Sequence, residues 1–410
     1  MNLFSLMGEV TVTAPKSLWV TIINWVNSLV GNFGWTIILV VLLIKVVTTP
    51  LDFFVKLNTK KQTLVQQKCA PQIAKLQKKF GADKNSFRIQ SQAIYKREGY
   101  DMKSGCLIML INTILSLVIF ITFYTALRKV SAYEAIYQYE QIETNYSDAF
   151  YTSMANNSAD FDDKESAITW WKTFTENEAK VNAGTATEDE TTAYNTSKAY
   201  YDANKDTLFQ TATEDASKAA VDYWNANKGP SSWLWVQNIW VADSTAKPFP
   251  LYSTLQSNAK STGYSEYVDA INEDSYNRIA TIIIENSPRA NNGYYILAVL
   301  AGVITFAAQY ITELHTKLKN KKANALAKAA GNETASSMKM LKIIMPIIMV
   351  VFVLTTSASF GLYILSSNVS SILLGELTTL AVDKLTKNKR IEVEASLEKE
   401  ANKLIKKGRL

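Results

Sequence analysis

The sequence predicts an all-α, polytopic membrane protein with five transmembrane helices, a cytoplasmic helical hairpin and a helical extracellular insertion. Three observations predict this fold: five long apolar runs, short connecting segments rich in Lys and Arg, and one long connecting segment rich in acidic residues. An apolar run of about 20 residues forms a helix that crosses a hydrocarbon core of about 30 Å. The expected spans are residues 33–54, 105–127, 293–313, 338–357 and 359–382.

The charges of the connecting segments predict the orientation, because Lys and Arg in short loops stay in the cytoplasm. Residues 51–104 carry twelve basic residues against four acidic, residues 314–342 carry seven against one, and residues 383–410 carry nine against five. Residues 128–292 carry thirteen basic residues against twenty-four acidic. We therefore expect a multi-pass protein of the cell membrane, with its N-terminus outside and its C-terminus in the cytoplasm.

Residues 1–32 are expected on the outer face. They include an amphipathic helix whose polar Asn24, Asn27 and Ser28 lie away from an apolar stripe. With its two Trp residues, this helix is typical of one that lies in the membrane interface, although an ordinary packed helix has the same pattern. The stripe consists of Leu18, Ile22, Trp25, Val26 and Leu29.

Residues 55–104 show two helical patterns separated by the break Gly81-Ala82-Asp83, which predicts a helical hairpin with a basic surface. Such a surface attracts anionic lipid or RNA, and a solvated charged face is the other interpretation.

The cytoplasmic loop 314–337 and the basic tail 383–410 follow later in the chain. The tail has the alternating charge of a solvated helix and equally of a ribosome-binding helix.

Residues 128–292 are expected outside the cell. Ala, Asn, Thr, acidic residues and Tyr are frequent there, and aromatic residues recur at helical spacing on both sides of Gly184-Thr185. These patterns predict a small helical domain, with partial disorder as the alternative. Its role is not indicated by any motif.

Lys45 lies near the middle of the first span, where an ammonium group costs about 2.5–3.5 kcal/mol on insertion scales. The other spans carry polar residues at a similar depth, and we interpret them with Lys45 as the lining of a hydrophilic groove. Hydrogen bonds between helices explain any one of these polar residues as well, and snorkelling or structural pairing is the alternative for Lys45. The expected groove residues are Lys45, Asn112, Ser116, Gln309, Ser367 and Asn368.

Enzymatic chemistry has few residues to draw on in this sequence. One His and two Cys without metal-ligand spacing exclude multi-His zinc sites and His-based triads. No Gly-rich phosphate-binding loop is present. We therefore expect no catalytic residue, no metal and no cofactor, and no DNA partner.

The order of these features resembles the YidC membrane protein insertase family. The resemblance is carried by "GNFGWTIILVVLLIKVVTTPLD" at 31–52, "AIYKREGYDMKSGCLIMLI" at 93–111, "PSSWLWVQNIWVADS" at 230–244 and "GLYILSSNVSSIL" at 361–373. It covers residues 33–128 and 230–382 in one consistent order. The family usually has arginine at position 45, two prolines where Ile108 and Ile114 stand, and a much shorter segment between the second and third spans. The resemblance is therefore to a divergent member of the family.

The resemblance implies a membrane insertase and chaperone with a groove open to the cytoplasm and to lipid. Its clients are nascent membrane proteins, inserted alone or with the Sec translocon, and the basic tail would bind the ribosome. Lys45 would attract the acidic outer tail of a client. The hairpin would receive the client through Lys75, Lys78, Lys79, Arg88, Lys96 and Arg97.

Three other functions fit parts of the sequence. A transporter or channel for an anionic solute would use Lys45 as its binding charge, but the hydropathy shows no repeated halves. A chaperone that folds spans inserted by the Sec translocon is a second activity that the resemblance permits. An intramembrane enzyme fits least, because paired aspartates, Ser-His pairs and metal clusters are missing.

Overall fold

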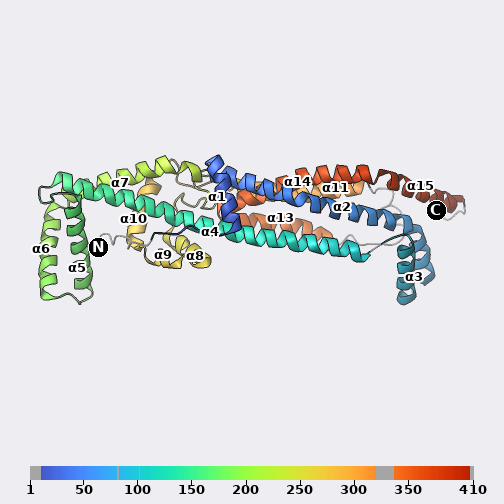
Figure 1. Cartoon of the computed structure of the whole chain (residues 1–410), viewed down its shortest axis with the longest axis horizontal. Helices are drawn as coiled ribbons and strands as arrows, with labels where there is room; N and C mark the ends of the chain where they lie inside the picture. The colour runs from blue at the N-terminus through green and yellow to red at the C-terminus, as the bar shows by residue number, and fades with distance from the viewer. Residues whose placement is uncertain (1–10, 81–82, 101, 320–336, 407–410) are drawn as a thin grey trace. The chain divides into compact units, whose positions relative to one another are not determined.

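The protein is described by a computed structural model that covers residues 11–80, 83–100, 102–319 and 337–406 (Figure 1). Across these residues the chain is helical, with only one isolated β-bridge between Trp233 and Val236, so the predicted all-α class is confirmed. The chain divides into two compact units. One contains Tyr124–Leu297, Val353–Leu362 and the residues up to Ile37, and the other contains Ile38–Phe123, Ala298–Phe352 and the residues from Tyr363 onward.

Four of the five helices that carry the predicted spans are longer than those spans, and α13, with 19 residues, is about as long as its span. Three of them are long and apolar enough to cross a membrane: α2, α4 and α14. The described apolar parts of the other two, Ile296–Ile311 and Ile344–Thr355, are shorter. The five helices are α2 (Phe33–Phe80), α4 (Met102–Asn157), α11 (Ile296–Lys319), α13 (Ser337–Thr355) and α14 (Ala358–Leu385).

The remaining helices are shorter than α2 and α4. Both α2 and α4 extend beyond their predicted spans. The second half of α2 forms the first arm of the predicted hairpin, and α3 forms the other arm. Gly81 and Ala82 of the predicted break lie outside the described residues, as does most of the loop 314–337. These helices are α1 (Leu18–Val30), α3 (Lys84–Arg97), α5 (Lys164–Asn182), α6 (Glu188–Asn204), α7 (Leu208–Asn227), the 3-10 turn η1 (Gly229–Ser231), α8 (Tyr252–Thr262), α9 (Ser265–Asp269), α10 (Glu273–Glu285) and α15 (Lys387–Lys406).

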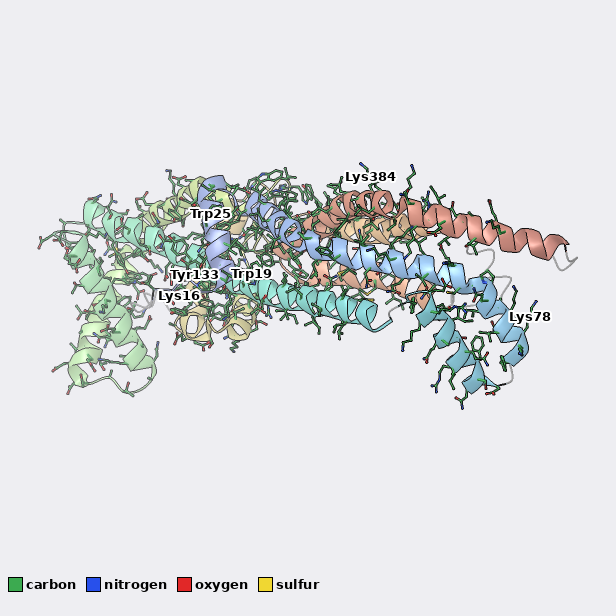
Figure 2. The ribbon with its side chains drawn as sticks, turned by 45° about the vertical axis from the view of Figure 1, so that its right-hand side comes forward. Lys16, Trp19, Trp25, Lys78, Tyr133 and Lys384 are labelled. Carbon is green, nitrogen blue, oxygen red and sulfur yellow. The ribbon has the colours of Figure 1, made fainter. Side chains whose placement is uncertain are left out.

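Helix α1 begins at the N-cap Ser17, whose side chain accepts a hydrogen bond from the Val20 N–H, and it ends at Gly31, which has a positive φ of 70°. It buries Val20, Ile23 and Val26. Val26, which the predicted stripe included, therefore packs inside. The exposed apolar residues at its surface are Leu18, Trp25 and Leu29, and Figure 2 labels Trp25 on this helix.

The predicted helical insertion contains a hydrophobic core. The second half of α4 packs with α5, α7, α8 and α10 around buried aromatic side chains, among them Tyr139, Tyr146, Trp171 and Tyr276. Trp171 lies 4.9 Å from Phe150, ring centroid to ring centroid. Aromatic burial of this extent explains how an otherwise polar segment folds.

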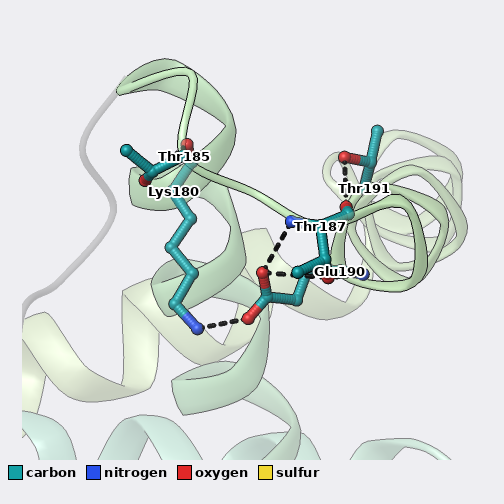
Figure 3. Close-up of polar contacts among 5 residues, drawn as sticks. All are labelled: Lys180, Thr185, Thr187, Glu190 and Thr191. Carbon is teal, nitrogen blue, oxygen red and sulfur yellow. Dashed lines mark hydrogen bonds and ion pairs between the residues drawn. The ribbon is translucent and has the colours of Figure 1, made fainter.

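Helices α5 and α6 form a hairpin whose turn follows Gly184, a residue with a φ of 69° (Figure 3). Thr187 caps α6 by accepting a hydrogen bond from the Glu190 N–H, and the Glu190 carboxylate accepts one from the Thr187 N–H at 2.8 Å. Lys180 on α5 pairs with the same carboxylate. These contacts lower the pKa of Glu190 to about 2, chiefly through its hydrogen bond with Lys180.

A pH test of this turn follows from the direction of the shift. The pKa of the Glu190 carboxyl is lower in the folded state than in the unfolded state. Its contribution to the stability of the turn is therefore present above about pH 4.5 and is lost as the pH falls toward 2. We expect pepsin to cleave the turn at residues 183–187 only below about pH 3. The variant Lys180→Met should be cleaved at a pH closer to 4.5, whereas Lys198→Met, which removes an ion pair elsewhere on α6, should behave like the wild type. Equal pH profiles for all three proteins would contradict this prediction.

Residues 229–244 hold the first turn of α2 in place. The Asn32 side chain donates hydrogen bonds to the Ser232 carbonyl at 2.7 Å and to the Gly229 carbonyl at 3.0 Å, and it accepts one from the Trp35 N–H. A Cβ atom on Gly34 would collide with the indole of Trp233. A glycine at position 34 is therefore required by this close approach, and Asn32 binds the same segment.

The same segment caps α11. The Asp243 carboxylate accepts hydrogen bonds from the Tyr294 N–H at 2.8 Å and from the Leu297 N–H at 2.6 Å. A third bond comes from the indole N–H of Trp235 at 3.3 Å. Asp243 is buried, so these bonds fix where α11 begins.

Candidate functional site

Lys45 is the charged residue on an otherwise apolar stretch of α2. Its neighbours Leu42, Leu43, Val46 and Val47 are exposed, as expected for side chains that face lipid. Lys45 itself is half-buried and lines a cavity of about 230 Å³. An intramembrane charge that faces a cavity rather than lipid has access to water, which reduces its desolvation cost.

The cavity lies between α2 and α14. Its α2 wall has the spacing i, i+4, i+7 and i+11, which places four polar side chains on one face of the helix. Its α14 wall contributes two hydroxyls, one glycine and one leucine. The lining residues are Lys45, Thr49, Asp52, Lys56, Ser371, Leu374, Gly375 and Thr378.

Lys56 joins the two walls. Its ammonium donates hydrogen bonds to the Gly375 carbonyl at 2.7 Å, to Thr378 Oγ1 at 2.9 Å and to Thr379 Oγ1 at 3.3 Å. A Cβ atom on Gly375 would lie 3.4 Å from Lys56 Nζ, so a glycine leaves room for the ammonium to reach the helix backbone. Further along the same helices, Lys60 pairs with Asp383 at 3.4 Å.

Asp52 joins the cavity to α4. One of its carboxylate oxygens accepts a hydrogen bond from the Asn112 side-chain amide at 3.2 Å. Within the described residues, no hydrogen bond or ion pair joins the Lys45 ammonium to another side chain. Asp52 instead acts on Lys45 through space, as the nearby opposite charge.

The other predicted groove residues differ in their contacts and in their exposure. Asn112 contacts the cavity through Asp52, and the Asn368 amide donates a hydrogen bond to Thr305 Oγ1 on α11 at 2.9 Å. Gln309 on α11 has a buried side-chain oxygen with no hydrogen-bond partner among the described residues. Ser367 is half-buried on α14, and Ser116 is exposed on α4.

The two arms of the hairpin contact each other near its base, and the basic residues point outward. Lys68 pairs with Glu98 at 2.8 Å, and this hydrogen bond lowers the pKa of the Glu98 carboxyl. Gln66 donates a hydrogen bond to Tyr100 at 2.7 Å. The predicted client-receiving residues are all exposed: Lys75, Lys78, Lys79, Arg88, Lys96 and Arg97. Figure 2 labels one of them, Lys78.

Of the eight residues that line the cavity, the sequence interpretation included only Lys45 among its groove residues, and the other seven were missed. The signal that would have found three of them is the helical spacing from Lys45 to Thr49, Asp52 and Lys56. The α14 wall has no comparable signal, because hydroxyls and glycines are common in membrane helices.

Comparison with known proteins gives a family match over part of the chain. The family described as "60Kd inner membrane protein" matches residues 25–170. These residues contain the whole of α2, α3 and α4, and so include the α2 wall of the cavity and Asn112. No solved structure matches.

Individual relatives carry the name "Membrane protein insertase YidC". The relative from Stenotrophomonas maltophilia (strain K279a) is 32% identical over 109 residues, which is 27% of this chain and 18% of the relative. The relative from Aromatoleum aromaticum is 30% identical over 105 residues, or 26% of this chain and 18% of the relative. One from Wolinella succinogenes is 24% identical over 106 residues, or 26% of this chain and 19% of the relative. The matched region therefore spans less than a fifth of the length of these relatives.

Proposed function

Because this chain is related through residues 25–170 to the YidC family of membrane protein insertases, we propose that it inserts nascent membrane proteins into the lipid bilayer. The observation that carries the proposal is the position of Lys45. A single cation without a direct partner among the described residues lines a polar cavity on a helix that is otherwise apolar. The relatives named above and the long apolar helices support a multi-pass protein of the cell membrane.

The proposed mechanism is electrostatic. Lys45 attracts the acidic outer tail of a client into the cavity, and the hydroxyls of Thr49, Ser371 and Thr378 replace part of the water that the tail loses. The path that the tail crosses in hydrocarbon is thereby shortened. The apolar helix of the client then moves into lipid, driven by the transfer of its own side chains. The proposed mechanism needs no covalent step and no catalytic residue.

The basic hairpin is proposed to receive the client on the cytoplasmic side. This assignment requires the N-terminus outside and the C-terminus in the cytoplasm, as the basic short loops predict. Its six exposed cations favour contact with anionic headgroups or with the acidic end of a client. The Sec translocon is a proposed partner for clients that this chain does not insert alone.

The ribosome is a proposed partner of the C-terminal tail. In α15 Val393 is buried while Lys387 and Lys389 are exposed, so the helix presents a basic face. Deleting residues 387–410 should reduce cosedimentation with ribosomes by about tenfold at low salt, because several phosphate contacts would be lost. The same deletion should leave ribosome-free insertion unchanged. Unchanged cosedimentation would leave α15 as a solvated helix.

The test of the proposed function is reconstitution. The purified chain in liposomes without translocon should make the outer tail of a single-span client resistant to added protease, whereas empty liposomes should not. Exposed client tails in both samples would contradict Sec-independent insertion, and a second sample that contains translocon would then test the chaperone activity. Flux of an anionic solute in the absence of client would favour a transporter, an alternative that the insertase relatives do not support.

A further inference from the structure

The Lys45 cavity contains one carboxylate that the proposed mechanism does not use. Asp52 lies seven residues after Lys45 on α2, on the same face of the helix, and lines the same cavity. A carboxylate opposes the attraction of an acidic client, so its presence in the site requires an explanation.

The two cations of the lining have different direct partners. Lys56 is held by three oxygen atoms of α14 and lies in the fields of both Asp52 and Glu376. Lys45 has no direct partner among the described residues, and Asp52 is the acidic residue that acts on it. Asp52 is therefore a counter-charge to both lysines of the lining, and Lys45 is the one of the two to which a client would bind, because it lacks a direct partner among the described residues.

Asp52 is also held in place. The side-chain amide of Asn112 on α4 donates a hydrogen bond to one oxygen of the Asp52 carboxylate, at 3.2 Å. The other carboxylate oxygen accepts no hydrogen bond among the described residues. The side chain is half-buried, so its charge is only partly screened by solvent. A fixed, partly desolvated charge repels a second carboxylate more strongly than a mobile exposed charge does.

We propose that Asp52 is a specificity-determining residue, which restricts the cavity to client tails that carry a single carboxylate. The formal charge of the lining is +1, from Lys45 and Lys56 against Asp52. One client carboxylate neutralises this charge and pairs with Lys45. A second carboxylate finds no free cation in the lining and is repelled by Asp52. This inference rests on the proposed insertase function and names the class of client for that site.

A purely structural role for Asp52 makes a different prediction. If the carboxylate served only to hold α4 through Asn112, its loss would reduce insertion of all clients by the same factor. A specificity role changes the order of preference among clients. The readout is therefore the ratio of insertion between clients rather than the activity with one client.

The experiment uses the full chain in liposomes and four clients that differ only in having zero, one, two or three Asp residues in the outer tail. The wild type should insert the one-Asp client best. In Asp52→Asn the optimum should move to two Asp residues, and the ratio of three-Asp to one-Asp insertion should rise by roughly tenfold, the effect of one charge several ångströms away in a partly hydrated cavity. Asp383→Asn removes one carboxylate from the same helix pair outside the cavity and should keep the wild-type ratio.

Asp52→Ser serves as a second variant, because it removes the charge and keeps an oxygen for Asn112. If Asp52→Asn and Asp52→Ser insert all four clients in the wild-type ratio, or lose all four equally, the inference is overturned. A wild type that inserts none of the clients overturns the proposed function and the inference together. A wild type that inserts clients irrespective of their charge leaves insertion standing and overturns the inference alone.

Discussion

Replacing Lys45 with Glu should abolish insertion of clients with acidic outer tails. A unit charge that acts on a carboxylate about 8 Å away contributes about 2 kcal/mol at an effective dielectric constant of about 20. Reversing the charge changes the interaction by about 4 kcal/mol, so insertion should fall by about two orders of magnitude or more. The fraction of protease-protected client tails in ribosome-free liposomes measures this effect.

Two controls separate charge from structure in that experiment. Lys45→Arg keeps the charge and should retain insertion, while Lys45→Ala should be intermediate. Lys384→Glu reverses an exposed lysine on α14 outside the cavity and should insert like the wild type (Figure 2). Full activity of Lys45→Glu would refute the electrostatic mechanism, because the remaining lining would then be sufficient.

Replacing Asp243 with Ala should produce the largest loss of stability among the variants considered. The substitution leaves the N–H groups of Tyr294, Leu297 and Trp235 without their acceptor, and the Leu297 bond is buried while the other two are part-buried. An unsatisfied buried donor costs about 1–3 kcal/mol and the part-buried donors add less, so the free energy of unfolding should fall by about 3 kcal/mol. The unfolding midpoint of the solubilised protein should fall by roughly 5–10 °C.

The matched control is Asp269→Ala, which removes an exposed aspartate from α9 in the same unit. Its midpoint should stay close to that of the wild type, because surface substitutions usually change stability by less than about 0.5 kcal/mol. If both variants unfold at the same temperature, water replaces the carboxylate at the start of α11, and the cap is not required for stability.

The helices were predictable from the sequence because the periodicity of apolar residues determines them directly. The five apolar runs appear within α2, α4, α11, α13 and α14, and aromatic residues at helical spacing correctly predicted a helical insertion. The ends of α2 and α4 were less predictable. Both helices continue far beyond their apolar runs, and polar helical residues give no signal for where a membrane ends.

The composition of the site was only partly predictable, for a physical reason. Lys45 is conspicuous because a charge in an apolar run is costly. Asp52 and Lys56 lie near the end of that run, where charged residues are ordinary, so their convergence on the cavity depends on packing against α14 and α4. The contact between Asn112 and Asp52 likewise depends on which faces of two helices meet, and a single sequence does not contain that information.

The hydrogen bonds from Lys56 to α14 connect residues that are 319 to 323 positions apart in the chain. During translation, the α2 wall of the cavity therefore leaves the ribosome well before the α14 wall does. A nascent copy of this protein therefore cannot use its own cavity for its biogenesis, and it depends on mature copies or on another machinery. Truncated chains that stop before α14 would be integral to the membrane yet inactive.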